Sequence, residues 1–270
     1  MKSVLLFIND DPGLEARLQA SLDLTRSLHG NLYCLRTNPY QPQMAFDGVT
    51  GMSVTYDIAQ LTLEENKKLR QQIEARLKEE DVPWSYMEYN ADFARGIARN
   101  SALMDIIVLS SMSGDKDNTI PLGILGDVLF NTHTPVLVQP NSMKKFDANC
   151  PAVVAWNGSF EAGNALRASV PLLKLASEVH IVTIAEEKKH DLPPMDASEY
   201  LSRHGIKSEI HEHEASKKAI QSVLLSVVDA LGAGYIVMGA YGHSRAREYL
   251  LGGVTRNLFM DCPVPLIVSH

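Results

Sequence analysis

Short apolar segments alternate with longer amphipathic segments along most of the chain, and many of the apolar segments are rich in β-branched residues. Segments of this kind are typical of buried strands, and the stretches between them have helical periodicity. Regular alternation of strands with helices favours a parallel sheet covered by helices on both faces. In the second half of the chain, the expected strands lie at 152–156, 179–184, 206–214, 235–240 and 265–269.

The residues that begin and end helices agree with this pattern. Apolar residues recur at helical spacing from Ile220 to Leu231, and Gly232 stands where a C-terminal cap is expected. Ser159 is placed to cap the helix that follows it. Pro171 lies inside the pattern of that helix and predicts a kink or a break.

The same order of segments occurs twice. Residues 105–130 align with 234–259 without a gap, and residues 4–37 resemble 152–184. A polar segment bounded by prolines separates the two copies. Internal repetition predicts two tandem α/β domains, each built on an open, twisted parallel sheet. The predicted domains span residues 1–141 and 150–270.

One segment has no counterpart in the second half. Between Thr37 and Thr62 the chain is rich in Pro, Gly, Met and Tyr. A connection this long is either functional, as a lid or a contact surface, or a mobile excursion. The sequence leaves both alternatives open.

Composition narrows the class of protein. The 270 residues are 45% hydrophobic and 21% charged, as in soluble globular proteins with a buried core. A net charge of −7 argues against generic binding to nucleic acid or to an anionic membrane. The three cysteines show no CxxC spacing, and the first apolar segment is too short for a signal peptide or a membrane span. We therefore expect a cytoplasmic protein.

A glycine-rich stretch follows the expected strand at 235–240. Gly239 and Gly242 allow sharp turns and close approach of a ligand to backbone N–H groups. Gly252 and Gly253 open the next helix, whose free N–H groups and positive dipole end suit a phosphate. By spacing alone, a phosphate site and a pair of ordinary turns both remain open.

The stretch "GAYGHSRAREYLLGGVTRNL", followed by "CPVPLIVSH", resembles the universal stress protein family. Nucleotide-binding members of that family carry the pattern G-x2-G-x9-G-[ST]. Gly239, Gly242 and Gly252 match its glycines, and Gly253 replaces its final Ser or Thr. The resemblance covers both halves. It implies a tandem member with two Rossmann-like domains of the adenine nucleotide alpha hydrolase type, each with five parallel strands. The two domains would be related by a pseudo-two-fold axis.

The resemblance also implies where a nucleoside would bind. "AWNGS" matches the family's A-x-D-G-S, with Asn157 in place of the aspartate, and Ile184 stands at an adenine-packing position. Trp156 is placed either to stack on a base or to lie in the core. The predicted nucleotide site comprises Trp156, Asn157, Ile184, Met238, Gly239, Gly242, His243, Ser244, Arg245, Gly252, Gly253, Val254 and Thr255.

The first half departs further from the family pattern. Ser110 and Ser113 replace the first two glycines, Ile124 replaces the final Ser or Thr, and Gly123 alone is kept. A β-carbon at the first two positions disfavours positive φ and close approach of phosphate. We expect this degenerate half to bind nucleotide poorly or not at all, and to act as a structural partner or to hold another ligand.

Two further groups of residues could hold a metal ion. His211 and His213 share one face of a probable strand and could form half of a zinc site with His204 or His190. A solvated polar strand end is the alternative.

Two neighbouring carboxylates follow the first expected strand. Asp10 and Asp11 could bind Mg²⁺ or cap the following helix. The sequence shows no nucleophile beside a base in a known local context, so we assign no catalytic residue.

These features favour a cytoplasmic regulatory module of the stress response whose second half binds ATP, ADP or AMP, with or without Mg²⁺. A slow metal-assisted nucleotide hydrolase and a non-binding interaction protein are the alternatives. We expect no nucleic-acid or membrane partner, and either an intramolecular pseudo-dimer or a homodimer of such chains.

Overall fold

The computed structural model describes residues 1–38, 51–110, 122–185, 192–214, 219–240 and 253–270. Strands and helices alternate along the chain, as the periodicity predicts. The elements of the first half are β1 (Ser3–Ile8), α1 (Leu14–Leu28), β2 (Asn31–Thr37), α2 (Gly51–Leu77), β3 (Trp84–Tyr89), α3 (Phe93–Ser101), β4 (Ile106–Ser110), α4 (Leu122–Asn131) and β5 (Val136–Gln139). Those of the second half are β6 (Ala152–Ala155), α5 (Phe160–Leu173), β7 (Val179–Ala185), α6 (Pro194–Arg203), β8 (Glu209–Glu214), α7 (Ile220–Ala230), β9 (Tyr235–Gly239), α8 (Gly253–Asp261) and β10 (Leu266–Ser269).

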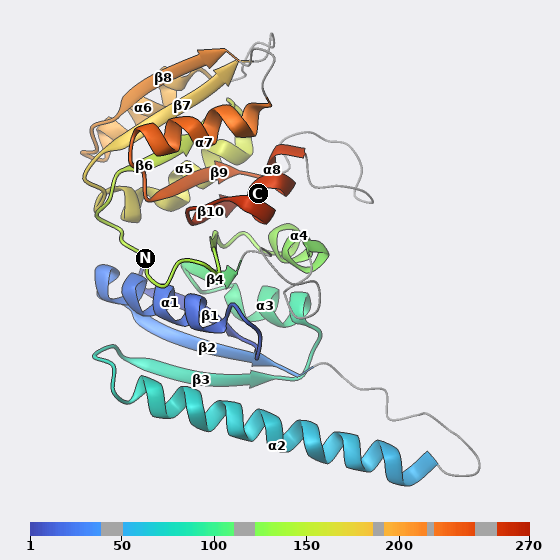
Figure 1. Cartoon of the computed structure of the whole chain (residues 1–270). Helices are drawn as coiled ribbons and strands as arrows, with labels where there is room; N and C mark the ends of the chain where they lie inside the picture. The colour runs from blue at the N-terminus through green and yellow to red at the C-terminus, as the bar shows by residue number, and fades with distance from the viewer. Residues whose placement is uncertain (39–50, 111–121, 186–191, 215–218, 241–252) are drawn as a thin grey trace.

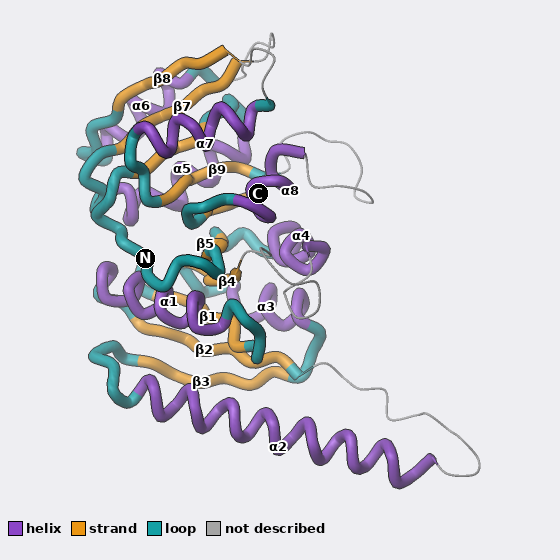
Figure 2. Tube along the Cα trace, in the orientation of Figure 1, coloured by secondary structure: helices purple, strands orange, loops and turns teal. Residues whose placement is uncertain are grey.

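All of these strands belong to one sheet in the order β3-β2-β1-β4-β5-β10-β9-β6-β7-β8 (Figures 1 and 2). Within each half every neighbouring pair is parallel. The two halves meet where β5 and β10 pair antiparallel, with Leu137 opposite Ile267. The strand order of one half is repeated by the other across this contact. The predicted fold, two tandem five-stranded parallel sheets related by a pseudo-two-fold axis, is confirmed.

Helices cover both faces of the sheet, and buried apolar side chains lie under the helices on each face. One buried apolar cluster packs residues of α1, α2, α5 and α6 against one face. A second cluster packs residues of α3, α4, α7 and α8 against the other face. The central strands therefore have apolar residues on both sides, which is why they are almost continuous apolar runs in the sequence.

The helix boundaries test three local predictions. Ser159 caps α5, and its hydroxyl accepts a hydrogen bond from Ala162 N, as predicted. Gly232 follows α7 with φ of 59°, the left-handed conformation that favours glycine at a helix C-terminus. Pro171 was predicted to kink or break this helix, and the break is wrong, because α5 continues through Pro171 to Leu173.

The long segment of the first half is partly helical. The helix α2 begins at Gly51, inside the stretch predicted to be a loop, while residues 39–50 lie outside the described residues. It runs along β3 at the outer end of the sheet (Figure 1). Among the described residues no helix, α2 included, is both long and apolar enough to cross a bilayer.

Candidate functional site

The candidate site lies where β7, β6 and β9 end side by side. In the second half the chain moves outward from β6 to β7 and β8, and then returns to the other side of β6 to form β9. The strand order reverses between β6 and β9, which is where parallel α/β sheets form ligand crevices. The register places Ala155 opposite Met238, so the residues that follow β6 lie beside the end of β9.

Gly239 is required by the packing at this point. A Cβ on Gly239 would lie 2.4 Å from the backbone nitrogen of Ala162 and 2.6 Å from the carbonyl carbon of Glu161. The end of β9 therefore touches the first turn of α5. From sequence, this glycine could serve a turn or the close approach of a ligand, whereas in the structure the backbone of α5 by itself excludes any larger residue.

A tight turn presents Asn157 beside the same helix end. Asn157 is exposed, and its side-chain oxygen accepts a hydrogen bond from Ser159 N at 3.2 Å. Gly158 has φ of 71°, so the turn uses the left-handed conformation. The exposed carboxamide of Asn157 thus lies close to the N-terminus of α5.

Trp156 lies in the core. It is only 4% exposed, and its indole Nε1 donates a hydrogen bond to Leu192 O at 3.0 Å. The structure therefore places its ring in the core position, which is one of the two alternatives left open by the sequence. Ile184 and Met238 pack against the apolar cluster on the other face of the sheet, and Ile184 stays partly exposed.

The start of α8 supplies the last described part of the site. The helix begins at Gly253, where a Cβ would meet no heavy atom of the described residues within 4 Å. Val254 is partly buried and Thr255 is buried. Five residues of the predicted site lie outside the described residues: Gly242, His243, Ser244, Arg245 and Gly252.

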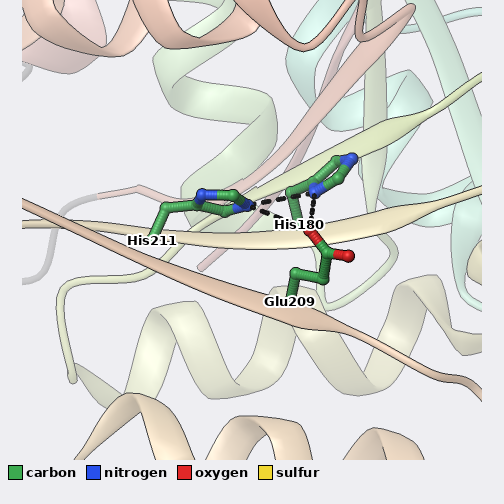
Figure 3. A group of neighbouring side chains, drawn as sticks. All are labelled: His180, Glu209 and His211. Carbon is green, nitrogen blue, oxygen red and sulfur yellow. Dashed lines mark hydrogen bonds and ion pairs between the residues drawn. The ribbon is translucent and has the colours of Figure 1, made fainter.

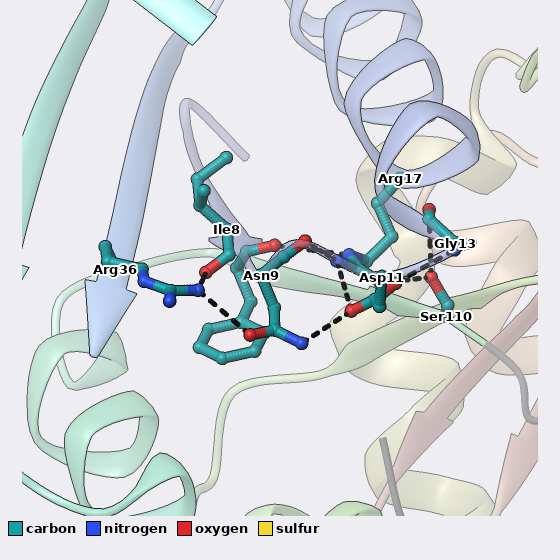
Figure 4. Close-up of polar contacts among 8 residues, drawn as sticks. Ile8, Asn9, Asp11, Gly13, Arg17, Arg36 and Ser110 are labelled. Atoms are coloured by element: carbon teal, nitrogen blue, oxygen red, sulfur yellow. Dashed lines mark hydrogen bonds and ion pairs between the residues drawn. The ribbon is translucent and has the colours of Figure 1, made fainter. Parts of the chain in front are cut away.

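The corresponding point of the first half is occupied by the side chain of Arg17 (Figure 4). This guanidinium is fully buried and forms an ion pair with Asp11 at 2.8 Å. It donates to both carboxylate oxygens of Asp11, to the carbonyl oxygens of Phe7 and Asn9, and to the hydroxyl of Ser110. These five hydrogen bonds use all five N–H donors of a guanidinium. The positively charged side chain of Arg17 thus lies at the switch point between β1 and β4.

The hydrogen-bond network around Arg17 also includes Asn9, which aligns with Asn157. Its amide nitrogen donates to Asp11, and its oxygen accepts from Arg36 at 2.9 Å. Asp11 is not the N-cap of α1, because Gly13 takes that position without a side-chain cap. Asp11 Oδ1 accepts a hydrogen bond from Gly13 N at 2.9 Å, and both Asp11 oxygens accept from Arg17. No oxygen of Asp11 is left without a protein partner, which disfavours a Mg²⁺ site here.

In each half, one glycine lets the end of the fourth strand contact the start of the first helix. In the first half, a Cβ on Gly13 would lie 2.4 Å from the hydroxyl oxygen of Ser110. Ser110 aligns with Gly239, and Gly13 aligns with Glu161. The second half thus has its glycine at the end of β9, whereas the first half has its glycine at the N-cap of α1. Because Gly13 has no Cβ, the first half has room for the hydroxyl of Ser110, which binds Arg17. Arg17 itself aligns with Ala165, so the second half has no guanidinium at this position.

Sequence reasoning found part of a histidine cluster. His211 lies on β8 as predicted, but its neighbours are His180 and Glu209. His204 instead packs against the ring of Tyr200, and His190 lies outside the described residues. The pairing of the adjacent strands β7 and β8 brings His180, Glu209 and His211 together.

Comparison with known proteins agrees with the fold. Residues 151–270 match the family model described as the universal stress protein family. The second half of the chain thus carries the domain that this family model describes. Over 99% of both chains it is 23% identical to Universal stress protein Slr1230 of Synechocystis sp..

Solved structures share the architecture over the whole chain. A universal stress protein from Archaeoglobus fulgidus aligns with a TM-score of 0.72 and 18% identity, over 98% of this chain and 97% of that one. A functionally unknown protein, PA1789 from Pseudomonas aeruginosa, aligns with a TM-score of 0.59 and 14% identity, over 100% of this chain and 92% of that one. At these identities the likeness shows a shared fold.

The contact between β9 and α5 can be tested by adding one methyl group. Gly239→Ala places a Cβ against the helix backbone, so we expect the free energy of unfolding to fall by about 1–3 kcal/mol, the usual cost of overpacking. Gly253→Ala is the matched control, because its Cβ meets no atom of the described part of the chain. Urea unfolding followed by circular dichroism measures both variants. Equal transition midpoints would contradict the contact.

The Arg17 network makes a second prediction. Arg17→Met removes the guanidinium and leaves the buried Asp11 carboxylate unpaired, which should cost about 3–5 kcal/mol of unfolding free energy. Replacing Asp11 by Asn in the same chain should recover part of this loss. Glu199→Gln, which breaks an exposed pair with Arg203, is the control and should change the urea midpoint far less. A loss no larger than that of the control would show that the network does not stabilise the first half.

Proposed function

We propose that this protein is a universal stress protein that binds one adenine nucleotide per chain, in its second half, and acts as a regulatory module. The observation that supports this most strongly is the difference between the two switch points. In the first half Arg17 fills the point with five hydrogen bonds, whereas the second half has Ala165 at the aligned position. On this basis the domain at 150–270 is the binding domain, and the domain at 1–141 is its structural partner.

The described residues suggest how the nucleotide is held. Asn157 presents a carboxamide that can hydrogen-bond a base edge or a sugar hydroxyl. Ile184 offers a partly exposed apolar surface for the base, and Trp156 supports the turn from the core. The first N–H groups of α8, at Gly253 and Val254, can donate to phosphate oxygens.

Glycine-rich residues outside the described part complete the proposal. Gly242 and Gly252 match the family's nucleotide-binding pattern, and the segment between them contains His243, Ser244 and Arg245. Backbone N–H groups and a cation are the donors that a phosphate chain requires.

Restoring the two polar groups that the family pattern has and this chain lacks should strengthen binding. Gly253→Ser adds a hydroxyl at the start of α8, and one hydrogen bond to a charged phosphate corresponds to an affinity gain of about tenfold to a hundredfold. Asn157→Asp restores a carboxylate for a sugar hydroxyl. Asn157→Ala should weaken binding. Equilibrium dialysis with ATP, ADP and AMP, with and without Mg²⁺, measures each dissociation constant and shows which nucleotide is preferred.

Ile124→Ser is the matched control, because Ile124 aligns with Gly253 in the first half. The same hydroxyl there should not change affinity, since Arg17 occupies the neighbouring switch point. If Ile124→Ser strengthened binding and Gly253→Ser did not, the assignment of the site to the second half would be wrong. Equal dissociation constants for the wild type and Asn157→Ala would overturn the role of Asn157.

A slow hydrolase remains the rival hypothesis. It predicts steady release of ADP or AMP from ATP in the dialysis samples, lost on addition of a chelator. Binding without turnover over the same period would favour the regulatory module.

A further inference from the structure

Three side chains that can bind metal ions lie on one face of the second half, away from the proposed nucleotide site. His180 lies on β7, and Glu209 and His211 lie on the neighbouring edge strand β8 (Figure 3). The register places His180 opposite Glu209 and Val182 opposite His211, so the three residues share one face of the sheet. This is the face covered by α7.

The distances within the cluster approach those of a tetrahedral metal site. His180 Nδ1 lies 3.1 Å from His211 Nε2. A tetrahedral zinc ion, with metal–nitrogen bonds of about 2.0–2.1 Å, separates two ligand nitrogens by about 3.3 Å. Glu209 Oε2 lies 3.8 Å from the first nitrogen and 3.9 Å from the second. The Glu209 side chain is 75% exposed, so a small rotation can bring its oxygen to bonding distance.

A second carboxylate orients the buried histidine. The His180 side chain is 3% exposed, and its Nε2 lies 3.2 Å from Glu178 Oε2. When the Nε2 proton is donated to Glu178, the lone pair of Nδ1 faces His211. This pairing of a carboxylate with the outer nitrogen of a ligand histidine is the usual support of a histidine bound to zinc.

A cavity beside the cluster provides access and a further nitrogen. It has a volume of about 320 Å³ and is lined by His211, His213 and residues of α7 that include Val223 and Val227. His213 Nε2 is buried and has no hydrogen-bond partner among the described residues. A buried, unpaired nitrogen costs about 1–3 kcal/mol, so its presence beside His211 points to a ligand in this region. The cavity also gives an ion a route to His211.

We propose that His180, Glu209 and His211 bind a divalent transition metal ion, with Zn²⁺ as the best match. Two imidazoles and one carboxylate suit zinc, cobalt or nickel better than magnesium or calcium, which prefer oxygen ligands. Three protein ligands leave a fourth position for water or a small ligand. The proposal does not depend on nucleotide binding, because the cluster contains none of the residues assigned to the nucleotide.

Metal titration of the full-length, tag-free chain tests the site. After dialysis against a chelator, Zn²⁺ is titrated by calorimetry, and Co²⁺ is titrated by visible absorption, which reports tetrahedral geometry. We expect one equivalent per chain. His211→Ala and Glu209→Gln should each weaken binding by about tenfold or more, and Glu178→Gln by about 10- to 100-fold through the orientation of His180.

His204→Ala is the matched control, because it removes a histidine of the same half that packs on Tyr200 outside the cluster. It should leave the affinity unchanged. Circular dichroism of each variant shows whether it is folded, and Glu209 is exposed enough for its substitution to leave the core intact. Absence of binding to the wild type, or equal affinities for His211→Ala, Glu209→Gln and His204→Ala, would overturn the proposal.

Discussion

The backbones of β5 and β10 run antiparallel at the centre of the ten-stranded sheet, and this pairing joins the two halves. Every residue of both strands is buried. Without the contact, each half would expose an apolar strand with unpaired N–H and C=O groups, which is the arrangement most prone to association. Pairing within one chain therefore satisfies both edges. It also leaves β3 and β8 as the outer strands, both richer in polar residues.

Each half of this sheet has one switch point, and the two have diverged through a small number of residues. The packing constraint is the same in both, because the end of the fourth strand of each half touches the start of its first helix. Gly239 meets it in the second half and Gly13 in the first. With its glycine on the helix side, the first half can keep Ser110, whose hydroxyl binds the buried Arg17. The switch point of the first half is therefore part of the core.

Local signals in the sequence were sufficient for most of the fold. Strands with apolar residues on both faces, the Ser159 cap and Gly232 are all defined by neighbours in the chain, and each was predicted. The helix at Gly51 was missed, because the stretch before Thr62 contains glycine and β-branched residues that weaken helical periodicity. Pro171 was overestimated as a helix breaker, since it lies near the end of α5.

The sites were harder to predict, because their residues meet only through the sheet. Ser110 lies 93 residues from Arg17, and His180 lies 31 residues from His211. No spacing rule links such pairs until the strand order is known. Gly239 shows a second difficulty: a glycine that matches a ligand-binding motif can also be required by packing, and the sequence does not distinguish the two.

The central claim is that a single switch point of this chain admits a nucleotide, because Arg17 closes the other. Native mass spectrometry of the full-length chain at saturating ATP tests it most directly, since each bound nucleotide adds a defined mass. We expect one nucleotide per chain, including any retained from the cell. Two nucleotides per chain, or none, would contradict the account.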